Sequence, residues 1–212
     1  MTMRITVFGA AGSVGARVVA EALSRGHEVT AVVRDSARFR ELPAEAHHRT
    51  ADARDPEEVT RLAAGQDVVI TATRPAPGLE HELVTATKAL LAGLTGTGVR
   101  LLVVGGAATL TTPGGLTVVE DPGLPAEIRD IALACAAQHA ACRAETSVDW
   151  TYLSPPALLE PGERTGTYRL GTDELLVDAH GESRISIEDL AVALLDEAEH
   201  PTHHQTRFTV AY

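Results

Sequence analysis

The stretch RITVFGAAGSVG, residues 4–15, joins a short apolar run to three glycines in a G-x-x-G-x-x-G spacing. The run is typical of a buried strand, and the residues that follow it are typical of a helix. Gly9 permits a tight turn, Gly12 lets the backbone approach a pyrophosphate, and Gly15 lets the helix pack closely on the sheet. An ordinary strand-to-helix turn is the alternative. Because amides at a helix N-terminus attract phosphate charge, this context favours dinucleotide binding. The predicted binding turn comprises Gly9, Ala11, Gly12, Ser13, Val14 and Gly15.

Short β-branched runs alternate with Ala-rich and Leu-rich segments along most of the chain. This alternation is typical of a doubly wound parallel sheet, so we expect an α/β protein with a single Rossmann-type domain over residues 1–212. Strands are predicted near 4–8, 28–33, 48–51, 67–71, 100–104 and 150–153. Helices are predicted at roughly 14–25, 56–64, 80–94 and 126–146.

The composition of the sequence changes after Leu153, where the segment SPPALLEPGERTG is rich in proline, glycine and charged residues. Such a segment favours neither a regular helix nor a central strand. We therefore predict a small C-terminal lobe at 154–187 that shapes the substrate side of the site. Within and after it we expect a hairpin of 167–170 and 174–177, a turn at 180–182, a short run at 184–187, a last helix at 188–199 and an edge strand at 206–211.

Length and charge limit the classes of partner. A chain of 212 residues is enough for one domain with a buried core. With 18 Lys and Arg against 29 Asp and Glu, the formal net charge is −11, which opposes binding to nucleic acid or to an anionic membrane. No apolar run approaches the roughly 20 residues that cross a bilayer, and MTMRITVF does not read as a signal peptide. We expect a cytoplasmic monomer or homodimer that binds a small molecule.

The cysteines and the clustered histidines favour no metal site. Cys135 and Cys142 lie seven positions apart in a predicted helix, which separates their α-carbons by roughly 10 Å. That distance is too long for a disulfide, so we expect two buried free thiols. The paired and clustered histidines lie in predicted loops without a third ligand, so we predict surface residues and no bound metal.

The residues after the second predicted strand, VVRDSAR at 32–38, indicate which nicotinamide cofactor fits. Arg34 lies where a guanidinium can stack on adenine and grip a 2′-phosphate, with Ser36 and Arg38 as further donors. Asp35 supplies the alternative, because an acid there can accept a hydrogen bond from a ribose 2′-hydroxyl. The placement of positive charge favours NADPH over NADH.

Three later segments are expected at the carboxyl ends of strands, where an open α/β sheet binds its ligand. Asp52 follows the third predicted strand, where it either contacts the adenine amino group or shapes a turn. Thr73 and Arg74 follow the fourth and are expected to flank the cofactor. The segment after the fifth strand is Gly105, Gly106 and Ala107. This segment either leaves room for a flat ring over the nicotinamide or packs against the cofactor alone.

GAAGSVG, VVRDSAR and TYLSPPALLEPGERTG together resemble the atypical short-chain dehydrogenase/reductase group, specifically its NAD(P)H-binding, NmrA-like branch. The resemblance is to proteins named as NADH-flavin reductases and to the small biliverdin/flavin reductases, and it runs from Arg4 to Tyr212. It implies a single Rossmann-type domain, NADPH in the crevice, and a flavin, quinone or similar planar acceptor stacked on the nicotinamide.

The usual proton donors of these enzymes are missing from the chain. Ordinary short-chain dehydrogenases use a Tyr followed four positions later by a Lys, whereas Lys88 is the only lysine here. Where the flavin and biliverdin reductases have a Ser after the fifth strand and a His after a Pro-Pro pair, this chain has Gly105 and Ala157. Hydride transfer to a flavin or quinone needs chiefly stacking and orientation, so a strong general acid is dispensable.

Polar residues near the expected mouth of the crevice are the remaining candidates for chemistry. His139 is expected on the helix after the long loop, either as a proton donor with a pKa near the working range or as a partly buried helix residue. Thr109 is the second catalytic candidate. Tyr152 is expected to pack in the core. The predicted substrate-binding residues are Ala107, Thr109, Ser154, Pro155 and Ala157.

The leading hypothesis is an NADPH-dependent reductase that passes a hydride to a planar acceptor such as a flavin or quinone. Two alternatives stay open. One is the reduction or redox-neutral rearrangement of a specialised aromatic metabolite. The other is an NmrA-like sensor, in which nucleotide occupancy changes a protein contact without turnover.

Overall fold

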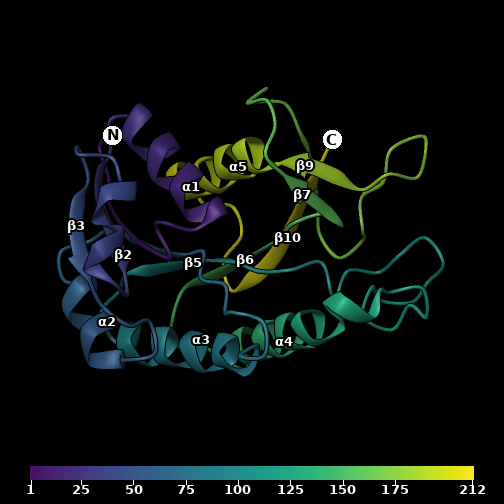
Figure 1. Cartoon of the computed structure of the whole chain (residues 1–212), viewed down its shortest axis with the longest axis horizontal. Helices are drawn as coiled ribbons and strands as arrows, with labels where there is room; N and C mark the ends of the chain where they lie inside the picture. The colour runs from purple at the N-terminus through teal and green to yellow at the C-terminus, as the bar shows by residue number, and fades with distance from the viewer.

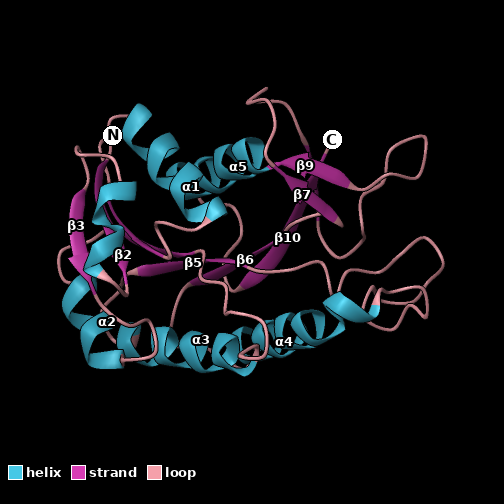
Figure 2. Cartoon of the chain, in the orientation of Figure 1, coloured by secondary structure: helices cyan, strands magenta, loops and turns pink.

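The computed structural model describes all residues, 1–212, and is built around an eight-stranded sheet in the order β3-β2-β1-β4-β5-β6-β10-β8 (Figures 1 and 2). Every neighbouring pair runs parallel except β10 with β8. A separate parallel pair joins β7 to β9. The strands are Arg4–Phe8 (β1), Glu28–Val33 (β2), His47–Thr50 (β3), Val68–Thr71 (β4), Arg100–Val104 (β5), Trp150–Ser154 (β6), Leu158–Glu160 (β7), Arg169–Gly171 (β8), Arg184–Ser186 (β9) and Thr206–Ala211 (β10).

Helices cover both faces of the large sheet, with α1 and α5 on one face and α2, α3 and α4 on the other (Figure 1). The helices are Ser13–Ser24 (α1), Pro56–Ala63 (α2), His81–Leu94 (α3), Ala126–Arg143 (α4) and Ile187–Glu199 (α5), with a 3₁₀ helix, η1, at Ser36–Glu41. Each face has its own buried apolar cluster: Val18 and Leu194 pack in the first, and Leu90 and Trp150 in the second. The predicted Rossmann-type α/β fold is confirmed.

The strand order reverses beside β1, and this reversal positions the site. From β1 the chain proceeds to β2 and β3 on one side, then crosses to β4 on the other side of β1. After β1 the chain leaves the sheet toward α1 on one face, and after β4 it leaves toward α3 on the other face (Figure 1). In doubly wound sheets a ligand binds in the crevice at such a switch point.

Local sequence explains where two of the helices start. Asp55 precedes Pro56, and its carboxylate accepts hydrogen bonds from the backbone N–H groups of Glu57 at 2.9 Å and Glu58 at 3.3 Å. Proline is tolerated at the first helical position because that residue has no intrahelical N–H partner. Ser186 accepts a bond from the Asp189 N–H at 2.9 Å and so caps α5.

The C-terminal part departs from two predictions. β8 pairs antiparallel with β10 and not with residues 174–177, so the predicted hairpin of 167–170 and 174–177 does not form. Leu175 instead donates its N–H to the carbonyl of Thr111, in the long loop after β5. β10 lies between β6 and β8 and so is not the predicted edge strand. Both errors arise because the pairing partners are distant in sequence, where turn chemistry gives no information.

The turn predicted at 180–182 forms: the Asp178 carbonyl accepts a hydrogen bond from the Gly181 N–H at 3.1 Å. η1 was not predicted from the sequence. No helix of the structure is both long enough and apolar enough to cross a membrane.

Candidate cofactor and substrate site

The turn between β1 and α1 requires its glycines. Gly9 has a φ of 80°, in the left-handed region that favours glycine, and a Cβ there would lie 2.7 Å from the Ala72 carbonyl oxygen. A Cβ on Gly15 would overlap the carbonyl oxygen of Gly9. The first turn of α1 therefore packs directly on the backbone of the loop, as the predicted role of Gly15 requires.

The N-terminus of α1 is suited to an anion. Gly12 occupies the N-cap position without a side-chain hydrogen bond, and the first turn holds no acidic residue. Each of the other four α-helices has at least one acidic residue in its first turn. The first amides of a helix have no intrahelical acceptor, so the N–H groups of Ser13 and Val14 are available to a phosphate.

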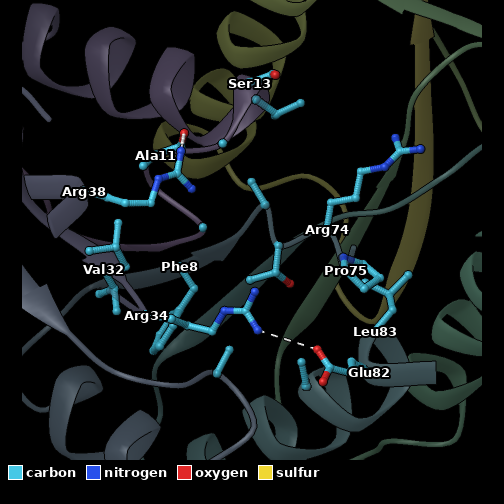
Figure 3. Close-up of a pocket in the computed structure, with 18 of the residues that line it drawn as sticks. Phe8, Ala11, Ser13, Val32, Arg34, Arg38, Arg74, Pro75, Glu82 and Leu83 are labelled. Atoms are coloured by element: carbon cyan, nitrogen blue, oxygen red, sulfur yellow. Dashed lines mark hydrogen bonds and ion pairs between the residues drawn. The ribbon is translucent and has the colours of Figure 1, made fainter. Parts of the chain in front are cut away.

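A cavity of about 550 Å³ opens beside this turn (Figure 3). Its lining comes from the loops after β1, β2, β3 and β4, from α3, and from the C-terminal segment. Most of the predicted cofactor residues line it, namely Gly9, Ala11, Gly12, Ser13, Val14, Arg34, Arg38, Asp52, Thr73 and Arg74. Four others do not belong to the lining: Gly15, Ser36, Gly105 and Gly106.

Charged groups gather at the end of the cavity beyond β2 and β3. The Arg34 guanidinium, at 60% side-chain exposure, lies 3.6 Å from the Glu82 carboxylate, and Figure 3 shows the two side chains directed toward one another. Glu82 also forms a much closer ion pair with Arg54. Arg54 in turn lies 2.6 Å from Asp52. The Glu82 carboxylate lies closer to Arg54 than to Arg34, so it neutralises the charge of Arg34 less than that of Arg54.

The Asp52 carboxylate shapes its own turn as well as lining the cavity. It accepts hydrogen bonds from the backbone N–H of Arg54 at 2.9 Å and from the Arg54 guanidinium at 3.0 Å. The Arg54 side chain is the main reason that the pKa of Asp52 is lowered, so this carboxylate is ionised at neutral pH. Both predicted roles of Asp52 are therefore compatible with its position.

Sequence reasoning missed Arg54 and Glu82. Arg54 stands in the same ADARD run as Asp52, so its place after β3 was a usable signal. Glu82 lies in the first turn of α3, where an acid is explained by the helix dipole alone. Only the approach of α3 to the end of β2 brings Glu82 to Arg34.

η1 fixes the second arginine of the VVRDSAR segment. The Asp35 carboxylate accepts a bond from the Ala37 N–H at 2.8 Å and so caps η1. Arg38 donates to the Ala11 carbonyl at 2.7 Å and pairs with Glu41 at the same distance. Arg38 thus ties the end of β2 to the glycine turn, and the Asp35 carboxylate is engaged in a local cap.

The opposite end of the cavity is largely apolar. Three residues of the C-terminal segment, Leu159, Pro161 and Ile187, line it, and Leu83 of α3 lies between Glu82 and Pro75 (Figure 3). Thr73 contributes a hydroxyl, which lies 3.1 Å from the hydroxyl of Thr71. The cavity lining contains no Tyr, His, Lys or Cys.

The two predicted catalytic residues meet outside this lining. The Thr109 hydroxyl accepts a hydrogen bond from Arg207 at 2.6 Å and lies 3.2 Å from Nδ1 of His139. The arginine can only donate, so Thr109 accepts from Arg207 and shares a second hydrogen bond with the imidazole of His139. Burial, together with the charges of Arg207 and Arg143, lowers the pKa of His139 to about 4. This lowered pKa disfavours the first predicted alternative, a proton donor with a pKa near the working range, and the burial of His139 on α4 agrees with the second, a buried helix residue. A catalytic role for either residue stays a prediction.

Comparison with known proteins identifies the family. A family profile described as NAD(P)H-binding matches residues 9–201. The chain belongs to this NAD(P)H-binding family. YwnB of Bacillus subtilis (strain 168) is 38% identical over 212 residues, with 98% of each chain covered.

Solved structures resemble the chain over its full length. A Bacteroides thetaiotaomicron protein proposed to be an epimerase is 38% identical with a TM-score of 0.92, covering 100% of this chain and 98% of that one. A Burkholderia pseudomallei protein proposed to be exported is 39% identical with a TM-score of 0.90, covering 100% of both chains. A Streptococcus pneumoniae protein proposed to be an NADH-flavin reductase is 31% identical with a TM-score of 0.90, covering 99% of each chain.

Membership of the NAD(P)H-binding family confirms the predicted resemblance to the atypical short-chain dehydrogenases/reductases. The chain is an NAD(P)H-binding protein. The glycine turn, the unpaired first-turn amides of α1 and the cavity beside them fit such a dinucleotide.

The segment after β5 departs from the flavin and biliverdin reductases that the sequence resembles. The phenol ring of Tyr152 fills the space where a Gly105 side chain would lie, and the Gly106 N–H donates to the Tyr152 hydroxyl at 3.2 Å. The Gly105 N–H donates to the Leu153 carbonyl at 2.9 Å. The predicted space for a flat ring beside Gly105 is therefore occupied by protein on the α4 side, and these two amides already have acceptors.

The predicted substrate residues of the β6 end are also not in the lining. Ser154 is fully buried, and its hydroxyl has no hydrogen-bond partner in the structure. Pro155 is buried too, whereas Ala157 is exposed. Ala107 lies outside the lining with the rest of its loop. The C-terminal segment reaches the cavity a few residues later, through Leu159 and Pro161.

Proposed function

We propose that the chain is an NADPH-dependent reductase that transfers a hydride to a planar acceptor, a flavin or a quinone. The observation that carries the proposal is the placement of Arg34 at one end of a cavity whose other end is apolar. A dinucleotide that crosses the switch point puts its adenosine beside β2 and its nicotinamide beside β4 and β5. The acceptor then stacks between the nicotinamide and the wall formed by Leu159 and Pro161.

Arg34 favours NADPH because its carboxylate partner, Glu82 at 3.6 Å, is paired more closely with Arg54, so the Arg34 guanidinium can bind a 2′-phosphate in the bidentate manner. Asp35, which would hold the 2′-hydroxyl of NADH, is engaged at the cap of η1. Of the other donors predicted beside Arg34, Arg38 lines the cavity and Ser36 does not. Asp52 and Thr73 complete the set proposed to contact the cofactor.

The proton balance favours a flavin or quinone acceptor. When bound, the reduced nicotinamide supplies a hydride, so NADPH, a proton and the acceptor yield NADP⁺ and the two-electron-reduced acceptor. The apolar end of the cavity offers no acidic side chain to donate that proton, so it comes from water. Flavins and quinones tolerate this because their reduced anions are stabilised by the ring itself. The chain's own contribution is to bind, orient and exclude bulk water.

A redox-neutral reaction of the epimerase type is the competing enzymatic candidate, favoured by the Bacteroides thetaiotaomicron relative proposed to be an epimerase. Such a reaction moves protons on and off carbon or oxygen and needs a paired acid and base. Asp35, Asp52 and Glu82 are the acids of the lining, and all lie toward the adenosine end of the cavity. This arrangement favours the reductase. The proposed location is the cytoplasm, where NADPH is supplied.

The test is oxidation of NADPH by the purified protein in the presence of riboflavin, FMN or a soluble naphthoquinone, followed by the loss of reduced-nicotinamide absorbance. We expect turnover with at least one of these acceptors and a stoichiometry of one NADPH per acceptor reduced. Tight NADPH binding without turnover of any of them would instead support a sensor or a redox-neutral enzyme.

A further inference from the structure

Four arginines line the cavity, and one of them has no partner. Arg34, Arg38 and Arg54 have a carboxylate at 3.6, 2.7 and 2.6 Å, respectively. The fourth, Arg74, is exposed in the lining and makes no hydrogen bond or ion pair with any residue of the chain. An unpaired guanidinium inside a ligand cavity is available to an anion.

Arg74 lies at the acceptor end of the cavity. It follows β4, whereas Arg34 follows β2 on the other side of the switch point. Figure 3 shows the Arg74 guanidinium directed away from Arg34 and from Glu82. The Arg34 and Arg74 guanidinium groups therefore serve different ends of a bound dinucleotide.

The strand pairing places Arg74 near the end of β5, because Thr71 at the end of β4 lies beside Val103 of β5 and the two loops leave the sheet next to each other. Burial raises the pKa of the Cys135 thiol on α4 to about 11, and the positive charge of Arg74 opposes this rise. The sulfur of Cys135 lies 2.7 Å from the position that a Cβ on Gly106 would take, directly after β5. Arg74, Cys135 and Gly106 thus belong to one neighbourhood, on the side of the sheet where the nicotinamide end of the cofactor is expected.

The apolar residues of the lining could contact a planar ring, and the charge of the Arg74 guanidinium would remain without a partner. Leu83, which Figure 3 shows beside Pro75, lines the cavity together with Leu159, Pro161 and Ile187 of the C-terminal segment, and none of the four carries a charge. The chain as a whole has a formal net charge of −11, so a negatively charged substrate is repelled at long range unless a local cation attracts it. Arg74 is the cation that meets this need.

We propose that Arg74 binds an anionic group, a phosphate or a carboxylate, that the planar acceptor carries outside its ring. This inference rests on the proposed reductase function, and it replaces the sequence-based prediction that Arg74 flanks the cofactor. The preferred acceptors are then anionic, and Arg74 is the residue that discriminates them from neutral acceptors with the same ring.

The first test is a binding measurement that needs no turnover. Protein saturated with NADP⁺ is titrated with FMN or with riboflavin, which share one ring system and differ by a phosphate, and flavin fluorescence quenching reports binding. We expect FMN to bind at least tenfold more tightly than riboflavin. Arg74→Gln should weaken FMN about tenfold and change riboflavin less than twofold, and Arg74→Lys should restore part of the loss. Arg40→Gln, at an exposed arginine outside the cavity, is the control for net charge and should change neither.

Two results would overturn the assignment. One is that the unmodified protein binds FMN and riboflavin with equal affinity, or that Arg74→Gln lowers the affinity for both flavins by the same factor. The other is a tenfold loss of NADP⁺ affinity in Arg74→Gln, which would return Arg74 to the cofactor.

Turnover separates this inference from the proposed function. We expect kcat/KM with NADPH to fall about tenfold for FMN in Arg74→Gln and to stay within twofold for riboflavin. A naphthoquinone with and without a carboxylate on a saturated side chain distinguishes carboxylate from phosphate recognition. If the unmodified protein reduces no acceptor, the proposed function is wrong, and the fluorescence titration alone decides whether Arg74 binds the anion.

Discussion

The ring of Tyr152 on β6 occupies the space that a side chain on Gly105 would need at the end of β5. A Cβ built on Gly105 overlaps Cζ, Cε1 and the hydroxyl oxygen of the ring. Tyr152 is completely buried, and its hydroxyl lies 3.2 Å from both the Cys135 carbonyl and the Gln138 amide oxygen. The loop after β5 and helix α4 are therefore joined through one tyrosine.

Gly105→Ala should destabilise the protein by about 2–3 kcal/mol, because a buried and hydrogen-bonded ring has to move. Urea denaturation measures this change in the free energy of unfolding. In a Tyr152→Leu background the same substitution should cost less than about 1 kcal/mol, since the space is then open. Equal costs in the two backgrounds would show that Tyr152 does not fill this space. Gly114→Ala is the matched control, because its Cβ would meet nothing closer than 3.7 Å.

Gly15→Ala should separate α1 from the loop that precedes it. The added methyl group overlaps the Gly9 carbonyl oxygen, so the first turn of the helix must shift away from the phosphate site. We expect NADPH affinity to fall at least tenfold by calorimetry, with little change in Gly114→Ala. Unchanged affinity in Gly15→Ala would mean that the first turn of α1 does not bind the pyrophosphate.

The depressed pKa of His139 predicts a loss of stability in mild acid. Its pKa of about 4 in the folded chain lies below the usual value of 6.5, because of burial and of Arg207 and Arg143, while Asp173 opposes them. Between pH 6.5 and pH 4 the unfolded chain therefore binds the extra proton, and stability falls as the pH falls through this range. From pH 7 to pH 5 this histidine contributes a loss of about 2 kcal/mol.

His139→Gln should remove that part of the pH dependence. The comparison is urea denaturation of both proteins at pH 7 and pH 5, so that every other titrating group cancels in the difference. If the two proteins lose the same stability between these values, His139 is not the neutral, buried group that the structure indicates.

A buried ion pair holds the opposite end of the sheet. Arg100 at the start of β5 pairs closely with Glu197 of α5, and Glu197 is only 4% exposed. Burial alone would raise the pKa of Glu197, but hydrogen bonds from His203 and Arg100 hold it at about 2. Glu197→Gln leaves the buried Arg100 charge with only the more distant, half-exposed Asp149 carboxylate at 3.5 Å, so we expect a loss of about 3 kcal/mol in unfolding free energy.

Glu41→Gln provides the exposed counterpart, because Glu41 pairs with Arg38 at 2.7 Å on the surface. We expect Glu41→Gln to lower the free energy of unfolding by less than about 1 kcal/mol. If Glu197→Gln is as mild as Glu41→Gln, the Arg100 pair contributes no more than a surface ion pair.

The parts of the site that the sequence predicted are those set by neighbouring residues. The glycine turn and Arg34 are each placed by a strand end and the few residues after it, so the strand pattern was sufficient. Glu82 and Tyr152 could not be predicted in the same way. Each meets its partner, Arg34 or Gly105, only after distant elements pack together.

The same limit explains the errors in the C-terminal part. Residues 167–177 have the local sequence pattern of a hairpin, but β8 pairs with β10, which lies near the end of the chain. The substrate lobe was expected to reach the ligand at Ser154, yet β6 remains buried at that residue and the first cavity contact is Leu159. Burial at a strand end depends on what covers it, which local sequence does not determine.

The central claim is that the cavity binds the reduced dinucleotide with Arg34 at its 2′-phosphate. The most direct measurement is isothermal titration calorimetry of NADPH and NADH with the unmodified protein and with Arg34→Ala. We predict that NADPH binds the unmodified protein more tightly and that the substitution weakens NADPH by at least tenfold while changing NADH less than about twofold. Equal weakening of the two nucleotides, or no binding of either to the unmodified protein, would contradict the account.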